Sequence, residues 1–183
     1  MATQVERPIT IIPASKSKTK MASLPLTRFL HENMATVITF GFSHWPIRRL
    51  IEEKFKSYWK YLEDFAFGVP ERNATRACLE IAVLLRLIEE PPAYRRWNFG
   101  VIYGTDGTTK LLSLRELTNK IIHAAELSWD LSDEKAPKLL CIAPSAQKEK
   151  YKWTKAEVDI VTLAAHCGTI ISSRGARIRP RPL

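Results

Sequence analysis

The chain has 183 residues, of which 45% are hydrophobic and 26% charged, and its formal net charge is +9. This is ordinary usage for one soluble globular domain. No apolar run is long enough to cross a membrane, because the best candidate, 77–88, is broken by Glu80 and Arg86. The first twenty residues lack a continuous apolar stretch, so we expect a cytoplasmic protein that is neither secreted nor bound to a membrane.

The excess positive charge lies at the two ends. Residues 1–23 carry +3 and residues 174–183 carry +4, which leaves +2 for the part between them. We expect both ends to be disordered basic tails, with Met21 as an alternative start. Such tails either keep a protein soluble or contact nucleic-acid phosphates. The candidate phosphate contacts are Lys16, Lys18, Lys20, Arg174, Arg177, Arg179 and Arg181.

Neither cysteine nor histidine spacing indicates a metal site. The three cysteines are far apart in sequence and read as reduced, buried, small apolar side chains. The four histidines have no metal-ligand spacing to one another or to cysteine, so we expect no metal and no cofactor. These residues are Cys78, Cys141 and Cys167, and His31, His44, His123 and His166.

The N-terminal half is predicted to be helical, in two segments. One helix should cover 26–40 and end near Gly41, and a second should begin at Pro46, where a proline costs little. Gly68 and Pro70 should end the second helix. Apolar residues at three- and four-residue steps give it one apolar stripe. That stripe is Ile47, Leu50, Ile51, Phe55, Tyr58, Leu62 and Phe65.

A third helix should start at Asn73, a good N-cap, and run to Glu90 before Pro91 and Pro92. Its main apolar stripe has seven members, and Val83 and Leu87 add a second apolar side. A helix this apolar should be central to the domain. The main stripe is Ala74, Ala77, Cys78, Ile81, Leu84, Leu85 and Ile88.

A hairpin is predicted near 97–112, with a turn at 104–107. Ser113 and Glu116 then form a capping box that starts the next helix. Alternation after residue 125 predicts a strand at 127–131, and after a turn at 133–137 a second strand is predicted at 138–143. The segment 151–159 fits either a strand or a helix, and we favour a strand, because two strands alone are only marginally stable.

These elements predict an α+β fold that is predominantly helical. One globular domain should cover 24–173. Within it, an N-terminal helical bundle with its hairpin fills 24–125, antiparallel strands fill 126–159, and a closing helix covers 160–171.

The helix that starts after Ser113 carries the most informative polar pattern. Its core face should hold Leu114, Leu117, Ile121 and Ala125. The opposite face should present Glu116, Asn119 and His123, stacked at three- and four-residue steps. A histidine beside an amide and a carboxylate can exchange a proton near neutral pH. The alternative is a solvated or partner-facing helix surface.

This stretch, after a helix-rich N-terminal half, resembles the HEPN superfamily over residues 26–125. Those are four-helix-type domains of toxin–antitoxin, abortive-infection and other defence systems. The active members are metal-independent RNases with an arginine, a polar residue and a histidine at a dimer cleft. Asn119 matches the polar position and His123 the histidine, whereas Thr118 stands in the arginine's place. Arg115 is nearby but outside the family spacing, and threonine cannot replace a planar cation.

The resemblance therefore implies a non-catalytic HEPN-like interaction protein of a defence or mobile-element system. The partners it implies are a second copy of the chain, forming a homodimer, and a protein or nucleic acid. One alternative is a nucleic-acid-binding module that uses the basic tails. Another is a metal-independent RNase that uses His123, with Arg115 replacing the family arginine. The candidate site residues are thus Arg115, Glu116, Asn119 and His123.

Overall fold

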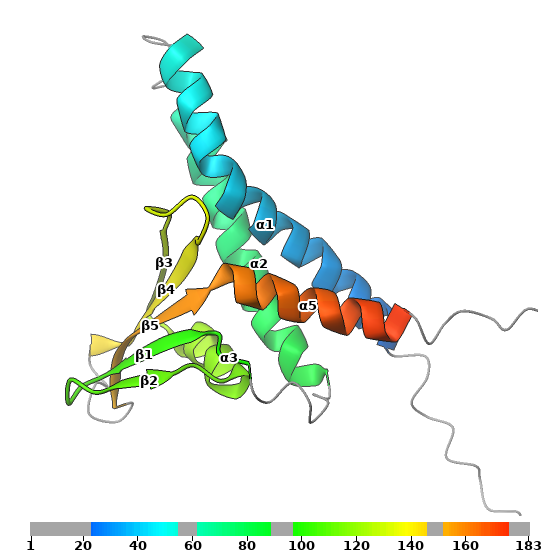
Figure 1. The fold of residues 1–183 in the computed structure, drawn as a ribbon, viewed down its shortest axis with the longest axis vertical. Coiled ribbons are helices and arrows are strands. Elements are labelled where there is room, and N and C mark those ends of the chain that lie inside the picture. The colour runs from blue at the N-terminus through cyan, green and yellow to red at the C-terminus, as the bar shows by residue number, and fades with distance from the viewer. Residues whose placement is uncertain (1–22, 55–61, 89–96, 146–151, 176–183) are drawn as a thin grey trace, which may run out of the picture.

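Five antiparallel strands form one sheet, and the helices pack against one of its faces (Figure 1). The computed structural model describes residues 23–54, 62–88, 97–145 and 152–175. The strand order is β2-β1-β5-β4-β3. The strands are β1 (Gly100–Gly104), β2 (Thr109–Leu111), β3 (Glu126–Asp130), β4 (Lys138–Ile142) and β5 (Trp153–Asp159). The helices are α1 (Ser23–Lys54), η2 (Asp64–Gly68), α2 (Val69–Leu87), α3 (Leu114–His123) and α5 (Ile160–Gly175).

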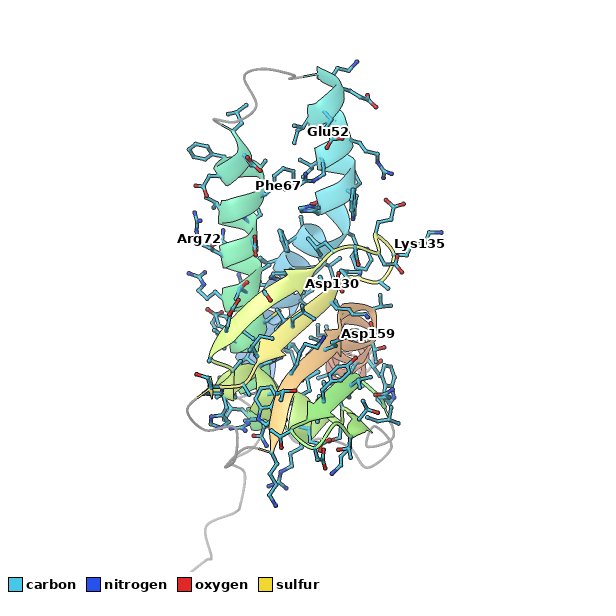
Figure 2. The ribbon with its side chains drawn as sticks, turned by 90° about the vertical axis from the view of Figure 1, so that its left-hand side faces the viewer. Glu52, Phe67, Arg72, Asp130, Lys135 and Asp159 are labelled. Carbon is cyan, nitrogen blue, oxygen red and sulfur yellow. The ribbon has the colours of Figure 1, made fainter. Side chains whose placement is uncertain are left out.

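Successive residues of the central strands β4 and β5 point to opposite faces of the sheet. Leu139 and Cys141 of β4 and Ala156 and Val158 of β5 are buried toward the helices. The other face is turned toward the viewer in Figure 2, in front of the helices. The α+β, mainly helical fold class and the strand in 151–159 are therefore confirmed, although residue 151 itself lies outside the described residues.

The hairpin β1–β2 belongs to this same sheet. β1 pairs with β2 on one side and with β5 on the other, with Ile102 opposite Ala156. The sequence placed this hairpin with the helical bundle that precedes residue 125, whereas the sheet in fact begins at Gly100. Pairing between residues so far apart in the chain leaves no trace in local periodicity.

The predicted helix break at Gly41 and Pro46 is wrong, because α1 continues through both residues. Proline inside a helix removes one hydrogen bond and bends the axis, and α1 changes direction in its cyan half (Figure 1). At these residues α1 packs against the connection between β3 and β4. The Trp45 indole donates to the Leu131 carbonyl, and Gly41 lies so close to Pro137 that an added Cβ would be 3.2 Å from its ring.

The predicted helix end at Gly68 and the N-cap at Asn73 are also wrong. The π-helix η2 passes directly into α2, with Gly68 in helical conformation at the junction. Pro70 follows this π-turn directly, so its missing N–H removes one hydrogen bond to the preceding turn without ending the helix. The predicted end near Glu90, with Pro91 and Pro92, lies outside the described residues.

The predicted apolar stripes are confirmed in α2 and fail in part around α1. Six of the seven α2 residues are buried and Leu84 packs partly buried against the core, while Val83 and Leu87 are exposed. In the other stripe Ile51 is buried, but Phe65 is 72% exposed. Leu50 and Leu62 are exposed as well, and Phe55 and Tyr58 lie outside the described residues.

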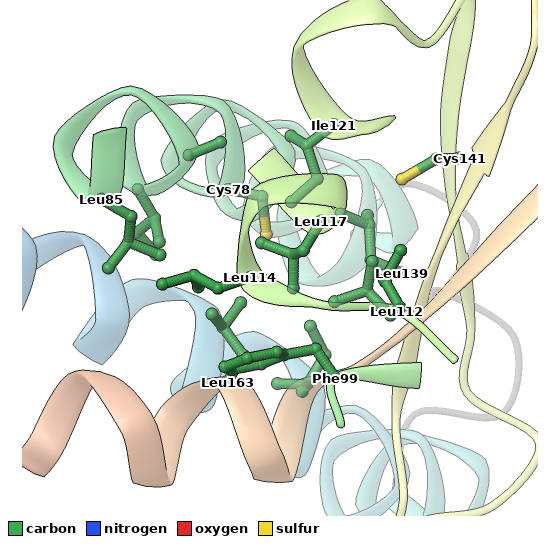
Figure 3. Close-up of a cluster of buried hydrophobic side chains, with 14 of the residues drawn as sticks. Cys78, Leu85, Phe99, Leu112, Leu114, Leu117, Ile121, Leu139, Cys141 and Leu163 are labelled. Atoms are coloured by element: carbon green, nitrogen blue, oxygen red, sulfur yellow. The ribbon is translucent and has the colours of Figure 1, made fainter. Parts of the chain in front are cut away.

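One hydrophobic core joins the helices to the inner face of the sheet (Figure 3). The three cysteines are free and buried in it, as predicted. Burial raises the pKa of the Cys141 and Cys167 thiols to about 12, so both are neutral. His166 is also buried, with its ring 5.1 Å from that of Phe99 and 5.5 Å from that of Trp97.

No described helix combines the length and apolar character that crossing a membrane requires. No group of three or more His, Cys, Asp or Glu side chains within 23–54, 62–88, 97–145 and 152–175 is placed to hold a metal ion.

Candidate phosphate-binding cleft

A cleft of about 560 Å³ lies between the C-terminal end of α2 and the first turns of α3. The helix α3 starts where the sequence predicts, because Ser113 and Glu116 form the complete capping box. We refer to this space as the arginine cleft. It is lined by Leu85, Arg86, Ile88, Leu114, Arg115, Thr118 and Asn119.

A buried hydroxyl connects the two arginines of the cleft. Thr118 is 2% exposed. Its Oγ1 accepts a hydrogen bond from Arg86 Nε over 3.4 Å and donates to the Arg115 carbonyl over 3.0 Å. A fixed acceptor restricts the rotamers of a long arginine side chain, so less entropy is lost when the guanidinium binds a ligand. Thr118 thus orients Arg86 beside the cleft.

The rest of the lining is apolar or uncharged. Leu85, Ile88 and Leu114 are buried and form an apolar wall. No carboxylate is among the described residues that line the cleft. Arg86 and Arg115 are both exposed, so their guanidinium groups give the mouth of the cleft a positive potential that salt screens.

Two of the four predicted site residues lie in the arginine cleft. Arg115 and Asn119 line it. Glu116 serves the helix start instead, because its carboxylate accepts from the Ser113 backbone N–H at 3.1 Å and from the Ser113 hydroxyl at 2.7 Å. His123, the last residue of α3, is exposed and outside the cleft lining.

The predicted core face of α3 is largely confirmed. Leu114, Leu117 and Ile121 are buried. Ala125 is exposed, because α3 ends before it. The cation Lys120 is part of the packing, with Nζ 4.5 Å from the centroid of the Trp153 ring, and burial lowers its pKa.

Sequence reasoning missed Arg86 as a site residue and treated Thr118 only as a missing arginine. Arg86 precedes Thr118 by 32 residues and comes from another helix. One signal was present, because Arg86 interrupts an otherwise apolar run near the end of a helix. A charge there marks an edge of the core, although it does not reveal which element lies opposite.

The predicted tail residues fall mostly outside the described part of the chain. Lys16, Lys18, Lys20, Arg177, Arg179 and Arg181 lie there. Arg174 is within α5, which reaches Gly175 and not Ile171 as predicted.

The arginine cleft can bind an oxyanion. Guanidinium groups donate paired hydrogen bonds to phosphate or carboxylate oxygens, and the Asn119 amide can donate or accept. No histidine or carboxylate is among the described lining residues that could exchange a proton with a ligand. Comparisons with models of protein families, with curated proteins and with solved structures found no match to this chain.

Proposed function

We propose that this protein is a non-catalytic interaction protein that binds single-stranded nucleic acid through a phosphate held in the arginine cleft. The observation that carries this proposal is the convergence of Arg86 and Arg115 on one cleft with Asn119 between apolar residues. Two planar cations suit the oxygens of a phosphodiester better than those of a neutral ligand.

The apolar wall supports a nucleic acid over a free phosphate. The cleft of about 560 Å³ is larger than a phosphate group, and Leu85, Ile88 and Leu114 offer a surface to a sugar or a base. A base can enter only when it is unpaired, which favours a single strand. The net charge of +9 adds long-range attraction to any polyanion.

The resemblance to the HEPN superfamily supports the same conclusion. Thr118 and Asn119 stand at two motif positions, and both line the cleft, where Arg86 supplies a cation beside Thr118. The histidine position, His123, is exposed outside the cleft lining. A member that keeps phosphate contacts without a proton-transfer group binds RNA and leaves it intact. Membership in this superfamily and its defence role stay part of the proposal.

Fluorescence anisotropy with a labelled single-stranded RNA of about 12 nucleotides tests the proposal. Arg86→Gln and Arg115→Gln should each weaken binding roughly tenfold, the effect of losing one charge-assisted phosphate contact. The matched control is Arg76→Gln, on the same helix, where Arg76 pairs with Glu80 over 3.4 Å. The control should bind within about twofold of the unmodified chain. Equal binding by all three variants would refute the cleft as the site.

The two alternative functions, nucleic-acid binding by the basic tails and RNase activity, predict different results with the same labelled RNA. If the basic tails bind the nucleic acid, with Arg174, Arg177, Arg179 and Arg181 as the contacts, deletion of residues 174–183 abolishes binding while Arg86→Gln has no effect. If the protein is an RNase, the labelled RNA is cut in the presence of a metal chelator and His123→Ala stops the cutting. The proposed function predicts that the RNA stays intact with the unmodified chain and with His123→Ala.

The proposed homodimer, with α3 at the interface, is tested separately. Analytical ultracentrifugation at micromolar concentration should show a dimer that His123→Glu weakens through charge at the interface. A monomer over the whole concentration range would remove the dimer and leave the arginine cleft unaffected, since that cleft is built from one chain.

A further inference from the structure

A second cavity, of about 450 Å³, lies between α1 and the η2–α2 segment. It exists because small side chains face each other across the two helices. Thr36, Thr39 and Ser43 lie at three- and four-residue steps on α1 and therefore share one face, opposite Ala66 and Pro70. Side chains of this size cannot fill the space between helices to the density of a core. We call this cavity the aromatic groove.

Three rings line the aromatic groove, and His44 contacts the other two. The His44 ring centroid lies 4.7 Å from that of Phe67 and 6.2 Å from that of Phe40. Phe67 lies within the π-helix η2, a rare conformation that occurs frequently at functional sites. Its neighbour Phe65, in the same π-helix, is 72% exposed and outside the groove lining.

One cation stands beside these rings. The guanidinium carbon of Arg48 is 5.2 Å from the centroid of the Phe67 ring. Burial, with Arg48 as a second cause, lowers the pKa of His44, so the imidazole is neutral at pH 7 and packs as a third aromatic ring. The Nδ1 atom of His44 is shielded from solvent and has no hydrogen-bond partner among the described residues. No carboxylate is among the described residues that line the groove.

We propose that the aromatic groove binds a small planar aromatic carboxylate. The ring of the ligand would lie against Phe40, His44 and Phe67, and its carboxylate would be attracted by Arg48 and hydrogen-bonded by hydroxyls of α1. The volume is in the range of small-molecule sites, and the combination of apolar rings with a few polar groups is typical of them. Charge complementarity favours the anion, since Arg48, which is not itself a lining residue, lies beside the lining ring of Phe67 and no described carboxylate lines the groove.

Isothermal titration calorimetry of the full chain with 1-naphthoate, to about 10 mM, tests this proposal. Ser43→Leu fills the groove from α1 and should weaken binding at least about tenfold. The matched control is Ser172→Leu, the same change at an exposed position of α5, which should leave binding unchanged. Circular dichroism of both variants confirms that each is folded.

The charge requirement is tested with a neutral probe of the same shape, 1-naphthalenemethanol. Arg48→Gln should weaken naphthoate binding roughly fivefold and change binding of the alcohol less than about twofold. Three results would overturn the proposal: no saturable binding of naphthoate, full binding by Ser43→Leu, or equal affinity for the two probes. None of these results bears on the arginine cleft, which is tested with RNA.

Discussion

Arg86 on α2 donates a hydrogen bond from Nε to the hydroxyl of Thr118 on α3 over 3.4 Å. In the proposed resemblance to the HEPN superfamily, Thr118 takes the place of the motif's arginine. The contact brings a guanidinium from a different helix to this residue. This contact is the basis of the proposed phosphate site, because it connects the two helices that form the cleft.

Removal of the Thr118 hydroxyl should weaken binding more than it weakens the fold. Thr118→Val keeps the shape of the side chain but frees Arg86, so RNA affinity should fall roughly three- to tenfold. The free energy of unfolding should fall by about 0.5–1.5 kcal/mol, the usual worth of one hydrogen bond. Affinity is measured by anisotropy and stability by urea unfolding.

The matched control for this change is Thr169→Val on α5. Its hydroxyl also donates to a backbone carbonyl, that of Ala165 at 2.8 Å, on a helix that contributes nothing to the arginine cleft. It should lose less stability, because its hydrogen bond is exposed whereas Thr118 is buried, and it should keep full RNA affinity. Equal affinity loss in both variants would mean that Thr118 acts only through stability.

Three glycine-to-alanine changes should have effects of different size and sign. Gly100 has φ +135, and an added Cβ would lie 1.9 Å from the Glu157 carbonyl oxygen in the neighbouring strand. Gly100→Ala should therefore lower the free energy of unfolding by roughly 3 kcal/mol or more. Urea unfolding followed by circular dichroism measures the loss, and a loss below about 1 kcal/mol would contradict this account of β1.

The other two glycines serve as controls. Gly107 has φ +79 in the β1–β2 turn but has nothing within 4 Å, so alanine should cost only about 1 kcal/mol. Gly168 lies within α5 with nothing within 4 Å, so alanine should raise the free energy of unfolding by about 0.5–1 kcal/mol.

Stability should fall in mild acid because of His166. Burial lowers the pKa of this imidazole in the folded chain, whereas the unfolded chain binds a proton near pH 6.5. Below that pH the unfolded state gains protons that the folded state does not, so the free energy of unfolding falls as pH decreases. The slope approaches about 1.4 kcal/mol per pH unit for each such histidine.

The acid effect is tested by urea unfolding between pH 7.5 and 5, a range that keeps most carboxylates ionised. His166→Leu should reduce the slope of unfolding free energy against pH by up to about 1.4 kcal/mol per pH unit, the effect of one proton. The pKa of His44 is lowered as well, so His44→Gln should flatten it further. An unchanged slope in His166→Leu would show that this ring is not the acid-sensitive group.

Local signals predicted the elements that local physics determines. The Ser113–Glu116 capping box marks the start of α3, and alternation of apolar and polar residues marks β3. The predicted helix boundaries at Gly41 and Pro46, and at Gly68 and Pro70, were wrong, because the chain stays helical through all four residues. Glycine and proline set only a local preference, and packing of α1 against the β3–β4 connection outweighs it.

The candidate site likewise has residues that local spacing predicts and one that depends on how two helices pack. Arg115 and Asn119 share one face of α3, so helical spacing could bring them together. The contribution of Arg86 depends on how α2 packs against α3, which no local pattern encodes. Helical spacing also placed Glu116 on the polar face, but its carboxylate is bonded to Ser113 and serves the helix start.

The most direct test of the phosphate site is the salt dependence of RNA binding by Arg86→Gln/Arg115→Gln. Each phosphate contact on a single strand contributes about 0.7 to the slope of log affinity against log salt concentration. We predict that the double variant lowers this slope by about 1.4 and the affinity by roughly a hundredfold, also in a chain without residues 176–183. The same slope and affinity in the double variant and the unmodified chain would contradict the proposed function.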